Sequence, residues 1–407
     1  HKRPSRNNTW TIPDRTGSIG DWEGRRRHHG STTRTIQCTL AHTLSARMLP
    51  APVRDPLFWP LAGIHLFIWL TLLGNLWYLR RHRTRSAVHD QPLLSICIPA
   101  RNEAANLRRL LPSLLKQTYP HFEVLVWDDG SGDATWDVLH SVDDHRIRAF
   151  HGDGPPAGWL GKVHALYQLT RRASGDRYLF LDADVDLPDP DAVARLVERF
   201  ESLPNDTVAS GLPRYRGAAL LLVSLVPSAI LTGLPWPLVR RLRTASLGAL
   251  NGQCWMITAD AYHAHEPHHE VRQEVLEDVE IGRYLKREGM TPVLLDVRRE
   301  ITVYMYDSFR EAWEGFRKNA YLILGGSPLA FVGLYAFFAL TWVVAPFVSP
   351  WFLISILGLK GITDRLGRLP LHLTLIAPVS YLLGSILQAD SALHHWTNRV
   401  SWKGRNV

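Results

Sequence analysis

The sequence predicts an α/β domain with a mostly parallel sheet, flanked by transmembrane and interfacial helices. Between residues 92 and 310, short runs rich in β-branched and aromatic residues alternate with segments of helical apolar spacing. This alternation is typical of strand–helix repeats around a parallel sheet. On both sides of this stretch lie long apolar runs without a formal charge, as expected of membrane helices.

Residues 1–50 carry most of the net charge. Residues 1–47 hold nine Lys and Arg against three Asp and Glu, a net +6 of the whole chain's +8. They lack sustained apolar periodicity and are rich in Arg, Ser, Thr and Gly, so we expect residues 1–50 to be disordered. Met48 precedes a plausible membrane entry and is an alternative start of the native protein. A nucleic-acid-binding arm is the competing interpretation, but the nearly neutral remainder predicts no nucleic-acid partner.

The cysteines indicate a reducing compartment. Cys38, Cys97 and Cys254 are scattered and odd in number. They form neither a disulfide framework nor a zinc-binding spacing.

Residues 57–79 predict a transmembrane helix, within a segment bounded at 55–80. Its 23 residues without a formal charge extend about 34 Å as a helix, enough to cross a hydrocarbon core of roughly 30 Å. Arginines follow at positions 80, 81, 83 and 85, and the positive-inside rule places the next domain in the cytosol. Residues 320–390 predict two or three further spans and residues 391–407 a cytosolic tail, so we expect a multi-pass protein of the cell (inner) membrane.

Residues 217–243 predict an interfacial segment. The stretch is apolar but contains three prolines and ends in three arginines. Broken apolar character with a basic edge suits a segment that lies in the membrane interface better than one that spans the bilayer.

Three strands of the predicted sheet end in polar motifs. Residues 93–100, 122–130 and 177–184 are the strands, and a helix with leucines at 107, 110, 111 and 114 follows the first. The strands run into the sequences PARNE, DDGSGD and DAD. Ligands of parallel sheets bind at the carboxyl ends of strands, so these motifs predict one common site.

The sequence YLFLDADVDLPDPDAV, residues 178–193, contains the Asp-x-Asp pattern three times. Asp182 and Asp184 follow a buried run, and they point alike if the strand continues. Asp189 precedes Pro190 and an amphipathic helix, which predicts a helix N-cap with Asp191 in the first turn. Asp186 stands in the connector, where we expect it to be solvated. The pair Asp182/Asp184 is therefore the predicted metal motif.

The ordered motifs resemble family 2 glycosyltransferases of the GT-A fold. The resemblance rests on ICIPARNEAANL, FEVLVWDDGSGDAT, LFLDADV and LEDVEIGRYLKREG, and covers about residues 92–320. More narrowly, GWLGKVHAL, HHEVRQEVLED, MYDSFREAWEGFRKN and WKGR are similar to the membrane-bound branch that glycosylates lipids, including carotenoid and hopanoid glycosyltransferases. No Gln-x-x-Arg-Trp motif follows the Glu-Asp pair, which argues against chain polymerisation.

The resemblance implies roles for individual residues. Asp278 is the implied catalytic base, and Asp184 with Asp182 the implied ligands of Mg²⁺ or Mn²⁺. The implied nucleotide-sugar pocket consists of Pro99, Ala100, Arg101, Glu103, Asp129, Lys162 and Asp182.

Further residues have open roles as acceptor or phosphate contacts: His268, Glu277, Trp313, Arg317 and Lys318. Arg317 and Lys318 fit either phosphate contacts or a membrane-interface position. Trp313 fits either an acceptor wall or interfacial anchoring. Four histidines in YHAHEPHHE match no zinc spacing and predict a polar loop near the pocket.

The predicted function is metal-dependent, inverting transfer of a sugar from a nucleotide sugar, with a UDP-sugar as the family-level expectation, to a membrane lipid on the cytosolic face. The predicted domain covers residues 90–316. One alternative is a polyprenyl-phosphate or exopolysaccharide glycosyltransferase of the same fold. An alternative of another class is a non-catalytic membrane protein with a degenerate nucleotide-sugar fold. The presence of all four expected carboxylates argues against it: Asp129, Asp182, Asp184 and Asp278.

Overall fold

The computed structural model describes residues 55–81, 91–402 and 405–406. Contacts divide the chain into two units, His1–Phe58 and Trp59–Val407. The expectations for residues 1–50, for Met48 and for the arginines at 83 and 85 lie outside the described residues. The fold described below is that of the second unit.

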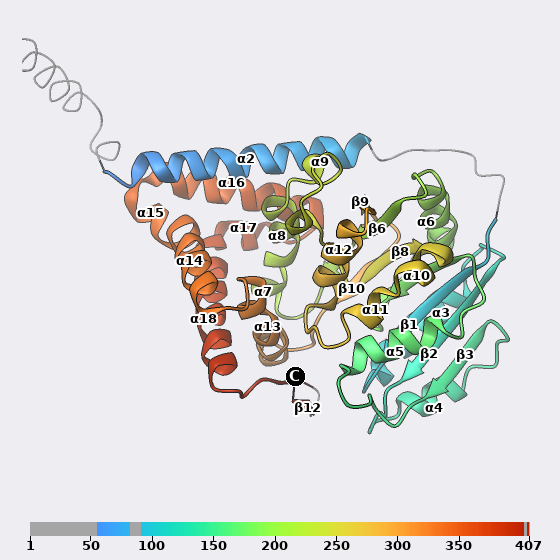
Figure 1. The fold of residues 1–407 in the computed structure, drawn as a ribbon. Coiled ribbons are helices and arrows are strands. Elements are labelled where there is room, and N and C mark those ends of the chain that lie inside the picture. Colours follow the sequence, from blue (N-terminus) through green and yellow to red (C-terminus); the bar gives the residue numbers. More distant parts are fainter. Residues whose placement is uncertain (1–54, 82–90, 403–404, 407) are drawn as a thin grey trace, which may run out of the picture. The chain divides into compact units, whose positions relative to one another are not determined.

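In the described part of this unit, a seven-stranded sheet has the order β3-β2-β1-β4-β8-β6-β9 (Figure 1). Neighbouring strands are parallel except at β8, which runs antiparallel to β4 and β6. The mostly parallel sheet predicted from the sequence is confirmed. The strands are β1 (Leu94–Ala100), β2 (Phe122–Asp128), β3 (Ile147–His151), β4 (Arg177–Leu181), β6 (Thr207–Leu212), β8 (Cys254–Thr258) and β9 (Thr291–Asp296).

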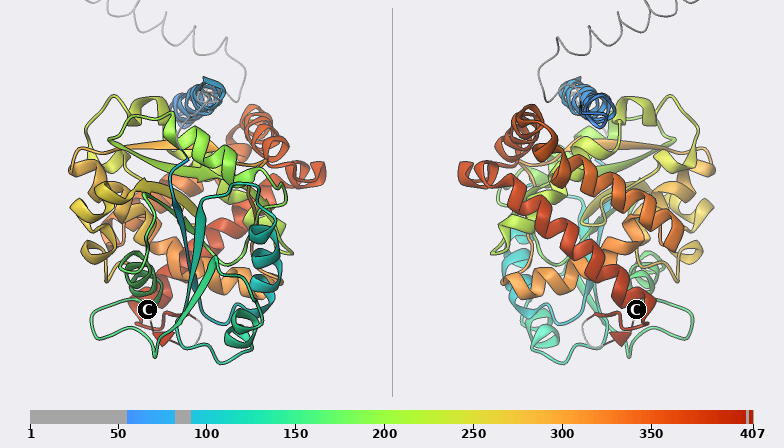
Figure 2. Two further views of the ribbon diagram at one scale, coloured as in Figure 1. Left: turned by 90° about the vertical axis from the view of Figure 1, so that its right-hand side faces the viewer. Right: turned by 90° about the vertical axis from the view of Figure 1, so that its left-hand side faces the viewer.

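Helices cover both faces of this sheet (Figure 2). Ile96 and Ile98 of β1 belong to one buried cluster with Leu107, while Cys97 belongs to another with Val163. Burial on both faces explains why the central strands are nearly continuous apolar runs. The covering helices are α3 (Ala104–Leu115), α4 (Thr135–His140), α5 (Gly161–Thr170), α6 (Ala192–Glu201), α10 (Ala259–His265), α11 (Pro267–Glu270) and α12 (Glu277–Arg287), with a 3₁₀ turn at Ala245–Leu247.

A second, three-stranded sheet links the Asp-rich turn to the C-terminal helices. β10 (Thr302–Tyr304) pairs antiparallel with β5 (Val185–Asp186) and parallel with β7 (Arg214–Arg216). The hairpin β11 (Ser401–Trp402) and β12 (Arg405–Asn406) ends the described chain.

The acidic pair at 189 and 191 is structural, as predicted, but helix α6 begins two residues later than expected. The Asp189 carboxylate accepts a hydrogen bond from the Asp191 N–H (3.0 Å) and lies 2.5 Å from Arg195. Asp191, rather than Asp189, occupies the N-cap position, and its carboxylate accepts from the Thr118 hydroxyl (2.6 Å).

The first apolar run forms helix α2 (Phe58–Arg81), as predicted. One side of α2 packs on α16 (Pro350–Gly367) (Figure 1), where His65 Nδ1 and Trp69 Nε1 lie 2.9 and 2.8 Å from the Ser355 hydroxyl. The other side is apolar and exposed, at Leu66, Leu70, Leu73 and Trp77.

The proline-containing segment 217–243 forms three short helices, and the second and third of them contact α2. They are α7 (Leu220–Val223), α8 (Leu225–Gly233) and α9 (Trp236–Val239). Asn75 of α2 is fully buried and donates to the carbonyls of Leu231 and Leu234, both at 2.8 Å, while its side-chain oxygen accepts from the Trp236 N–H at 2.8 Å. These bonds satisfy backbone groups at the end of α8, so much of the segment expected at an interface is packed against protein.

The C-terminal region is helical: α13 (Phe309–Ile323), α14 (Pro328–Ala339), a π-helical segment (Leu340–Val344), α15 (Ala345–Val348), α16, α17 (Leu371–Leu375) and α18 (Ala377–Trp396). Among the described residues, two helices, Phe58–Arg81 and Pro328–Val348, are long and apolar enough to cross a membrane, judged by length and composition alone. We expected two or three spans within residues 320–390, but only one described helix there, Pro328–Val348, has the length and composition of a span. α16 instead contains a buried ion pair of Lys360 and Asp364, and α18 extends past the expected boundary at 390.

Candidate active site

An ion-pair cluster joins three elements that are distant in the sequence. Lys162 Nζ lies 2.7 Å from Asp182 Oδ1 and 2.9 Å from Glu277 Oε1. Lys162 is in the first turn of α5, Asp182 follows β4, and Glu277 begins α12. Burial alone would lower the pKa of Lys162, but the two carboxylates outweigh it and hold that pKa above its usual value. The lysine is therefore charged.

Asp278 lies beside this cluster, at the N-terminus of α12. Its Oδ2 accepts a hydrogen bond from the Gly252 N–H at 2.8 Å, and its Oδ1 accepts from the Val279 N–H at 2.9 Å. Burial, and then the adjacent Glu277, raises the pKa of Asp278 to about 6. A carboxylate with this pKa is ionised at neutral pH and still basic enough to accept a proton.

Asp182 and Asp184 lie in a turn, because β4 ends at Leu181 and not at 184 as expected. The Val185 N–H donates to the Asp182 carbonyl at 3.3 Å, and the Asp184 carbonyl accepts from the Tyr304 N–H at 2.9 Å. The strand does not continue to Asp184, so the predicted shared direction of the two side chains, which depended on that continuation, does not follow. Burial raises the pKa of Asp182 despite the opposing effect of Lys162.

The donor set of this turn fits a hard cation. Across residues 55–81, 91–402 and 405–406, no group of three or more His, Cys, Asp or Glu is arranged to hold a metal ion. Asp182 and Asp184 offer only carboxylate oxygens, and Mg²⁺-type sites commonly use one or two carboxylates while substrate phosphates complete the coordination.

At the end of β2, Asp128 and Asp129 have different surroundings. The Asp128 carboxylate accepts from the Ser131 N–H and hydroxyl, at 3.1 and 2.5 Å, and is completely buried. The Asp129 N–H donates to the Ala100 carbonyl at 2.8 Å. Arg101 Nη1 donates to the Asp129 main-chain carbonyl at 2.9 Å and lies 3.7 Å from its carboxylate. Asp128 thus stabilises the turn, and Asp129 joins the ends of β1 and β2.

The loops after β1 and β2 interlock. Asn102, in the left-handed region at φ 52°, donates its N–H to the Ser131 hydroxyl and accepts from the Gly132 N–H, both at 2.8 Å. The Glu103 N–H donates to the Thr135 hydroxyl at 2.8 Å. The structure therefore brings together the implied nucleotide residues, with Pro99 and Ala100 ending β1 and Arg101 and Glu103 directly after them.

Helix α13 supplies a partly buried cation, Lys318, near the cluster. Burial lowers the pKa of Lys318, and Glu277 and Lys162 are the next groups that act on it. Trp313 Nε1 donates to Asp390 Oδ2 at 2.8 Å, and Arg317 lies 3.7 Å from the same carboxylate on α18. Trp313 and Arg317 thus contribute to α13–α18 packing, whereas Lys318 shares the electrostatic surroundings of Lys162.

His268 lies in an aromatic core. The histidine-rich stretch forms the short helices α10 and α11, not the polar loop expected. His268 is fully buried, Nδ1 lies 2.8 Å from the Tyr262 hydroxyl, and its ring centroid is 5.1 Å from Phe180. His268 is thus packed among aromatic side chains, and its role as an acceptor or phosphate contact stays a prediction.

Two backbone features of the site escaped sequence reasoning. The first is the loop 248–252, which holds Asp278 through the Gly252 N–H. It packs closely on α12, because a Cβ on Gly282 would lie 2.6 Å from Ala249 Cα. A backbone donor leaves no side-chain motif, so only the glycines of GALNGQ hinted at a close approach.

The second is Tyr306, which adopts φ 57° between β10 and α13. Its hydroxyl packs on Gly315, where a Cβ would lie 2.3 Å away. Burial, and then Asp184, raises the pKa of Tyr306. A partly buried, positive-φ tyrosine therefore lies close to the Asp-rich turn, and positive φ outside glycine often marks functional sites.

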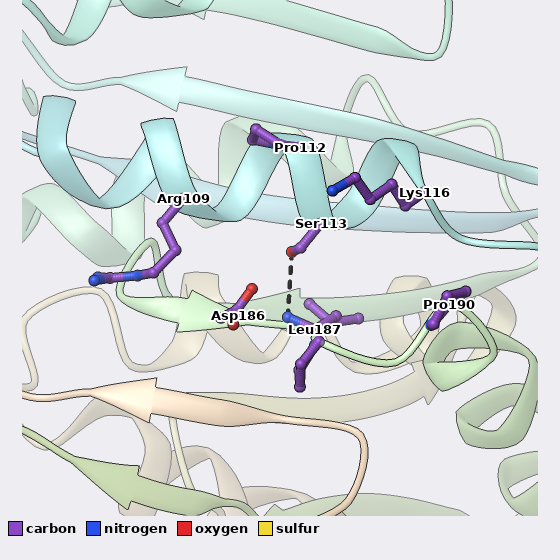
Figure 3. A pocket seen from close by; sticks show the side chains of 8 residues that line it. Arg109, Pro112, Ser113, Lys116, Asp186, Leu187 and Pro190 are labelled. Atoms are coloured by element: carbon purple, nitrogen blue, oxygen red, sulfur yellow. Dashed lines mark hydrogen bonds between the residues drawn. The ribbon is translucent and has the colours of Figure 1, made fainter.

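A separate hollow lies between α3 and the strand after the Asp-rich turn (Figure 3). Arg109, Ser113, Lys116, Asp186 and Leu187 are among its lining residues. The Ser113 hydroxyl accepts from the Leu187 N–H at 3.2 Å. We expected Asp186 to be solvated, but it is half-buried in this hollow. The hollow includes none of the acids of the ion-pair cluster.

Residues 95–264 match the family model described as Glycosyl transferase family 2. They run from β1 to α10 and include Asp129, Lys162, Asp182 and Asp184. Residues 95–264 form a family 2 glycosyltransferase domain. Glu277, Asp278 and α13 follow after the matched range.

Relatives of this glycosyltransferase domain are found in Staphylococcus aureus. A 4,4'-diaponeurosporenoate glycosyltransferase of strain N315 is 36% identical over 130 residues, which are 31% of this chain and 34% of the relative. The protein of the same name from strain USA300 is 35% identical over the same length. The chain thus spans about a third of the length of the curated relatives it matches.

Two solved structures are also similar. A mannosyltransferase from Pyrobaculum calidifontis, in complex with GDP-Man and Mn²⁺, is 16% identical, with 85% of this chain and 100% of that chain covered at a TM-score of 0.45. S. aureus TarS in complex with UDP is 17% identical, with 74% and 91% covered at a TM-score of 0.38.

Proposed function

We propose that the chain transfers a sugar, with inversion, from a nucleotide sugar of UDP type to a hydroxyl group of a membrane lipid at the cytosolic face. The observation that carries this proposal is Asp278. Its carboxylate is held at 2.8 Å by the Gly252 N–H and has a pKa of about 6. It lies beside the cluster of Asp182, Lys162 and Glu277. This cluster is at the end of strand β4 in the family 2 domain. The proposed catalytic domain, residues 90–316, extends past the family match to include α12 and the start of α13.

In this proposal, Asp129 and Arg101 bind the nucleoside, and Pro99, Ala100 and Glu103 line the same pocket. Lys162, whose charge is maintained by Asp182 and Glu277, places a positive charge near the diphosphate. Asp184 and Asp182 would hold Mg²⁺ or Mn²⁺ together with that diphosphate. The bound ion supplies charge neutralisation for the leaving group.

Asp278 serves as the general base. The acceptor hydroxyl oxygen forms a bond to the anomeric carbon as the bond from that carbon to the diphosphate oxygen breaks. The nucleoside diphosphate leaves with the bonding electron pair, and the hydroxyl proton moves to an Asp278 carboxylate oxygen. A single displacement of this kind inverts the anomeric centre.

A lipid acceptor is supported by two independent observations. The curated relatives carry a name that refers to 4,4'-diaponeurosporenoate, a carotenoid. Helices Phe58–Arg81 and Pro328–Val348 have the length and composition of spans, and Arg80 and Arg81 at the end of the first favour a cytosolic catalytic domain.

The test uses membranes that contain the full chain, incubated with labelled UDP-, GDP- and other nucleotide sugars, followed by mass spectrometry of extracted lipids. We expect one labelled lipid product that is absent with Asp278→Asn. Label in polymer or in polyprenyl phosphate would replace the lipid acceptor by another acceptor class. Absence of label in every fraction would contradict the proposed activity.

A further inference from the structure

Five exposed arginines lie where helix α9 meets the C-terminal end of α2. The two elements are in contact, because the Trp236 N–H donates to the Asn75 side-chain oxygen at 2.8 Å and a Cβ on Gly74 would lie 3.7 Å from Pro237. Figure 1 shows α9 beside this end of α2. Helix α2 ends about 9 Å beyond Asn75, and a basic stretch directly follows α9. The arginines are Arg80 and Arg81 on α2 and Arg240, Arg241 and Arg243 after α9.

The positive charge of these arginines is not balanced by acids. No ion pair among the described residues involves any of the five. Neither residues 58–81 nor residues 217–252 contain an Asp or a Glu. An exposed cluster of charges of one sign attracts a surface of the opposite sign, so the expected partner is anionic.

Large apolar side chains are exposed among these arginines. Leu238, Leu242 and Trp77 are 40%, 46% and 49% exposed. The guanidinium group of Arg81 lies over the Trp77 ring, 4.4 Å from the ring centroid. Such a mixture suits a membrane interface, where apolar side chains enter the acyl region and cations remain among the headgroups. The phosphates of a nucleic acid would pair with the arginines but would leave the leucines exposed.

The basic stretch after α9 is connected to the helix that carries Asp278. On α12, the buried Lys286 donates from Nζ to the Val239 carbonyl at 2.5 Å. After Arg243, the chain continues into the loop 248–252, where the Gly252 N–H donates to the Asp278 carboxylate at 2.8 Å. A partner bound at residues 238–243 is therefore connected to the proposed base by a contact with α12 and by the loop that follows.

We infer that residues 77–81 and 238–243 together bind the headgroups of anionic phospholipids, in the leaflet that faces the catalytic domain. This inference rests on the proposed function at a membrane. The guanidinium groups pair with the lipid phosphates, and the two exposed leucines contact the acyl chains. Bound lipid keeps α12, and with it Asp278, at the surface where a lipid acceptor presents its hydroxyl group.

Three variants of the full chain separate lipid binding from a general effect of charge. The arginine variant replaces three cations of the surface by glutamine, and the leucine variant keeps the cations and replaces both leucines by serine. The control variant removes the same charge from exposed side chains at α3 and α5. Exposed positions rarely affect stability, so Tm should be unchanged in all three. The variants are Arg240→Gln/Arg241→Gln/Arg243→Gln, Leu238→Ser/Leu242→Ser and the control Arg108→Gln/Lys116→Gln/Arg171→Gln.

Native mass spectrometry of the full chain in a neutral detergent measures the retained lipid. The protein is mixed with equal amounts of phosphatidylglycerol and phosphatidylcholine that have the same acyl chains. The wild type and the control variant should retain at least about fivefold more phosphatidylglycerol, because each arginine near anionic lipid contributes about fivefold in affinity. The arginine variant should retain both lipids equally, and the leucine variant should retain less of both.

Equal retention of the two lipids by the wild type, or an undiminished preference in the arginine variant, would overturn the inference. If the leucine variant retains as much phosphatidylglycerol as the wild type, the surface binds polyanions in general, and the assignment to lipid fails. The sugar-transfer assay is independent of this result. Absence of labelled product with every nucleotide sugar would contradict the proposed function, while lipid retention still decides whether this surface binds anionic phospholipid.

Discussion

At Asp278, two effects act in the same direction. Burial removes water from the carboxylate and Glu277 adds a neighbouring negative charge, so both favour the protonated form. The N–H groups of Gly252 and Val279 oppose this shift by stabilising the ionised form. Glu277 is 2.9 Å from Lys162, and the pKa of this acid is lowered although burial opposes that. Lys162 lowers the pKa of both acids, but it outweighs burial only at Glu277, so the two adjacent acids shift in opposite directions.

The pH dependence of turnover follows from Asp278. The base has to be ionised before it can accept the hydroxyl proton, so kcat should be constant above about pH 7 and fall through about pH 6, approaching tenfold per pH unit below it. Initial rates between pH 5 and 8 at saturating donor measure this. A profile without an inflection near pH 6 would remove Asp278 from the role of base.

Asp278→Asn should separate activity from stability. We expect kcat to fall by about 10²–10⁴-fold, because general base catalysis is lost. Folding raises the pKa of this acid, so above about pH 6, where Asp278 is ionised, its charge costs the folded state stability. The neutral amide removes that cost, so Tm at pH 7 should equal or exceed that of the wild type. Asp189→Asn, which loses the ion pair with Arg195, should keep its activity.

Removal of divalent metal tests the Asp-rich turn. Chelation should abolish sugar transfer, and Mn²⁺ or Mg²⁺ should restore it, because the carboxylates alone leave the diphosphate charge unbalanced. Asp184→Asn should need a metal concentration at least about tenfold higher for half-maximal rate. Asp186→Asn, on the neighbouring strand, is the control. Activity that survives complete chelation would be incompatible with a metal at Asp184.

At the level of elements, the central strands could be predicted because both of their faces are buried and their apolar runs are continuous. β1 and β2 agree with the sequence prediction to within two residues. β4 was predicted too long, since Asp182 begins a hydrogen-bonded turn that has no signal in the residues LDAD. The start of α6 was misplaced because the Asp189 carboxylate binds Arg195 as well as a backbone N–H.

The candidate site was predictable where side chains carry the chemistry. The motifs indicated Lys162, Asp182 and Asp278, and the structure places Lys162 and Asp182 in one cluster with Asp278 beside it. The Gly252 N–H and the positive-φ Tyr306 were not predictable, because one is a backbone donor and the other depends on packing against Gly315. The burial of His268 likewise depends on aromatic residues from three separate elements.

Gly282→Ala tests the contact between α12 and the loop 248–252. The added methyl group would lie 2.6 Å from Ala249 Cα, so either the helix or the loop has to move and the bond from Gly252 to Asp278 lengthens. We expect a loss of stability of about 1–3 kcal/mol and a lower kcat with little change in KM for the donor. Thermal unfolding and donor kinetics measure these effects. Gly63→Ala, where an added Cβ has no atom within 4 Å, should have neither effect, and unchanged kcat in Gly282→Ala would argue against the loop's role.

At the scale of the whole molecule, large apolar side chains remain exposed on the helices outside the α/β domain. Leu329 and Phe347, both in the second candidate span, are 87% and 88% exposed. Soluble monomers rarely expose apolar patches of several hundred Å², so this exposure supports the proposed membrane location of these helices.

The double variant Leu329→Asp and Phe347→Asp should weaken membrane association. Charged groups within a bilayer are costly, by about 2.5–3.5 kcal/mol each on insertion scales. We expect a larger fraction of the chain in the supernatant after carbonate extraction or in aggregates. Arg108→Asp, an exposed substitution on α3, should leave the distribution unchanged. Full retention of the double variant in the membrane would place these residues outside the lipid.

The attachment of α2 through Asn75 has a consequence for synthesis on the ribosome. The carbonyl that receives the first of its hydrogen bonds lies 156 positions further along the chain, and the Ser355 contact of His65 lies 290 positions away. At about 5–20 residues per second, roughly 8–30 s pass before the carbonyl that Asn75 binds is synthesised. On the proposed membrane location, lipid or a targeting factor shelters α2 during that delay, and the helix enters the bilayer before the proposed catalytic domain has folded.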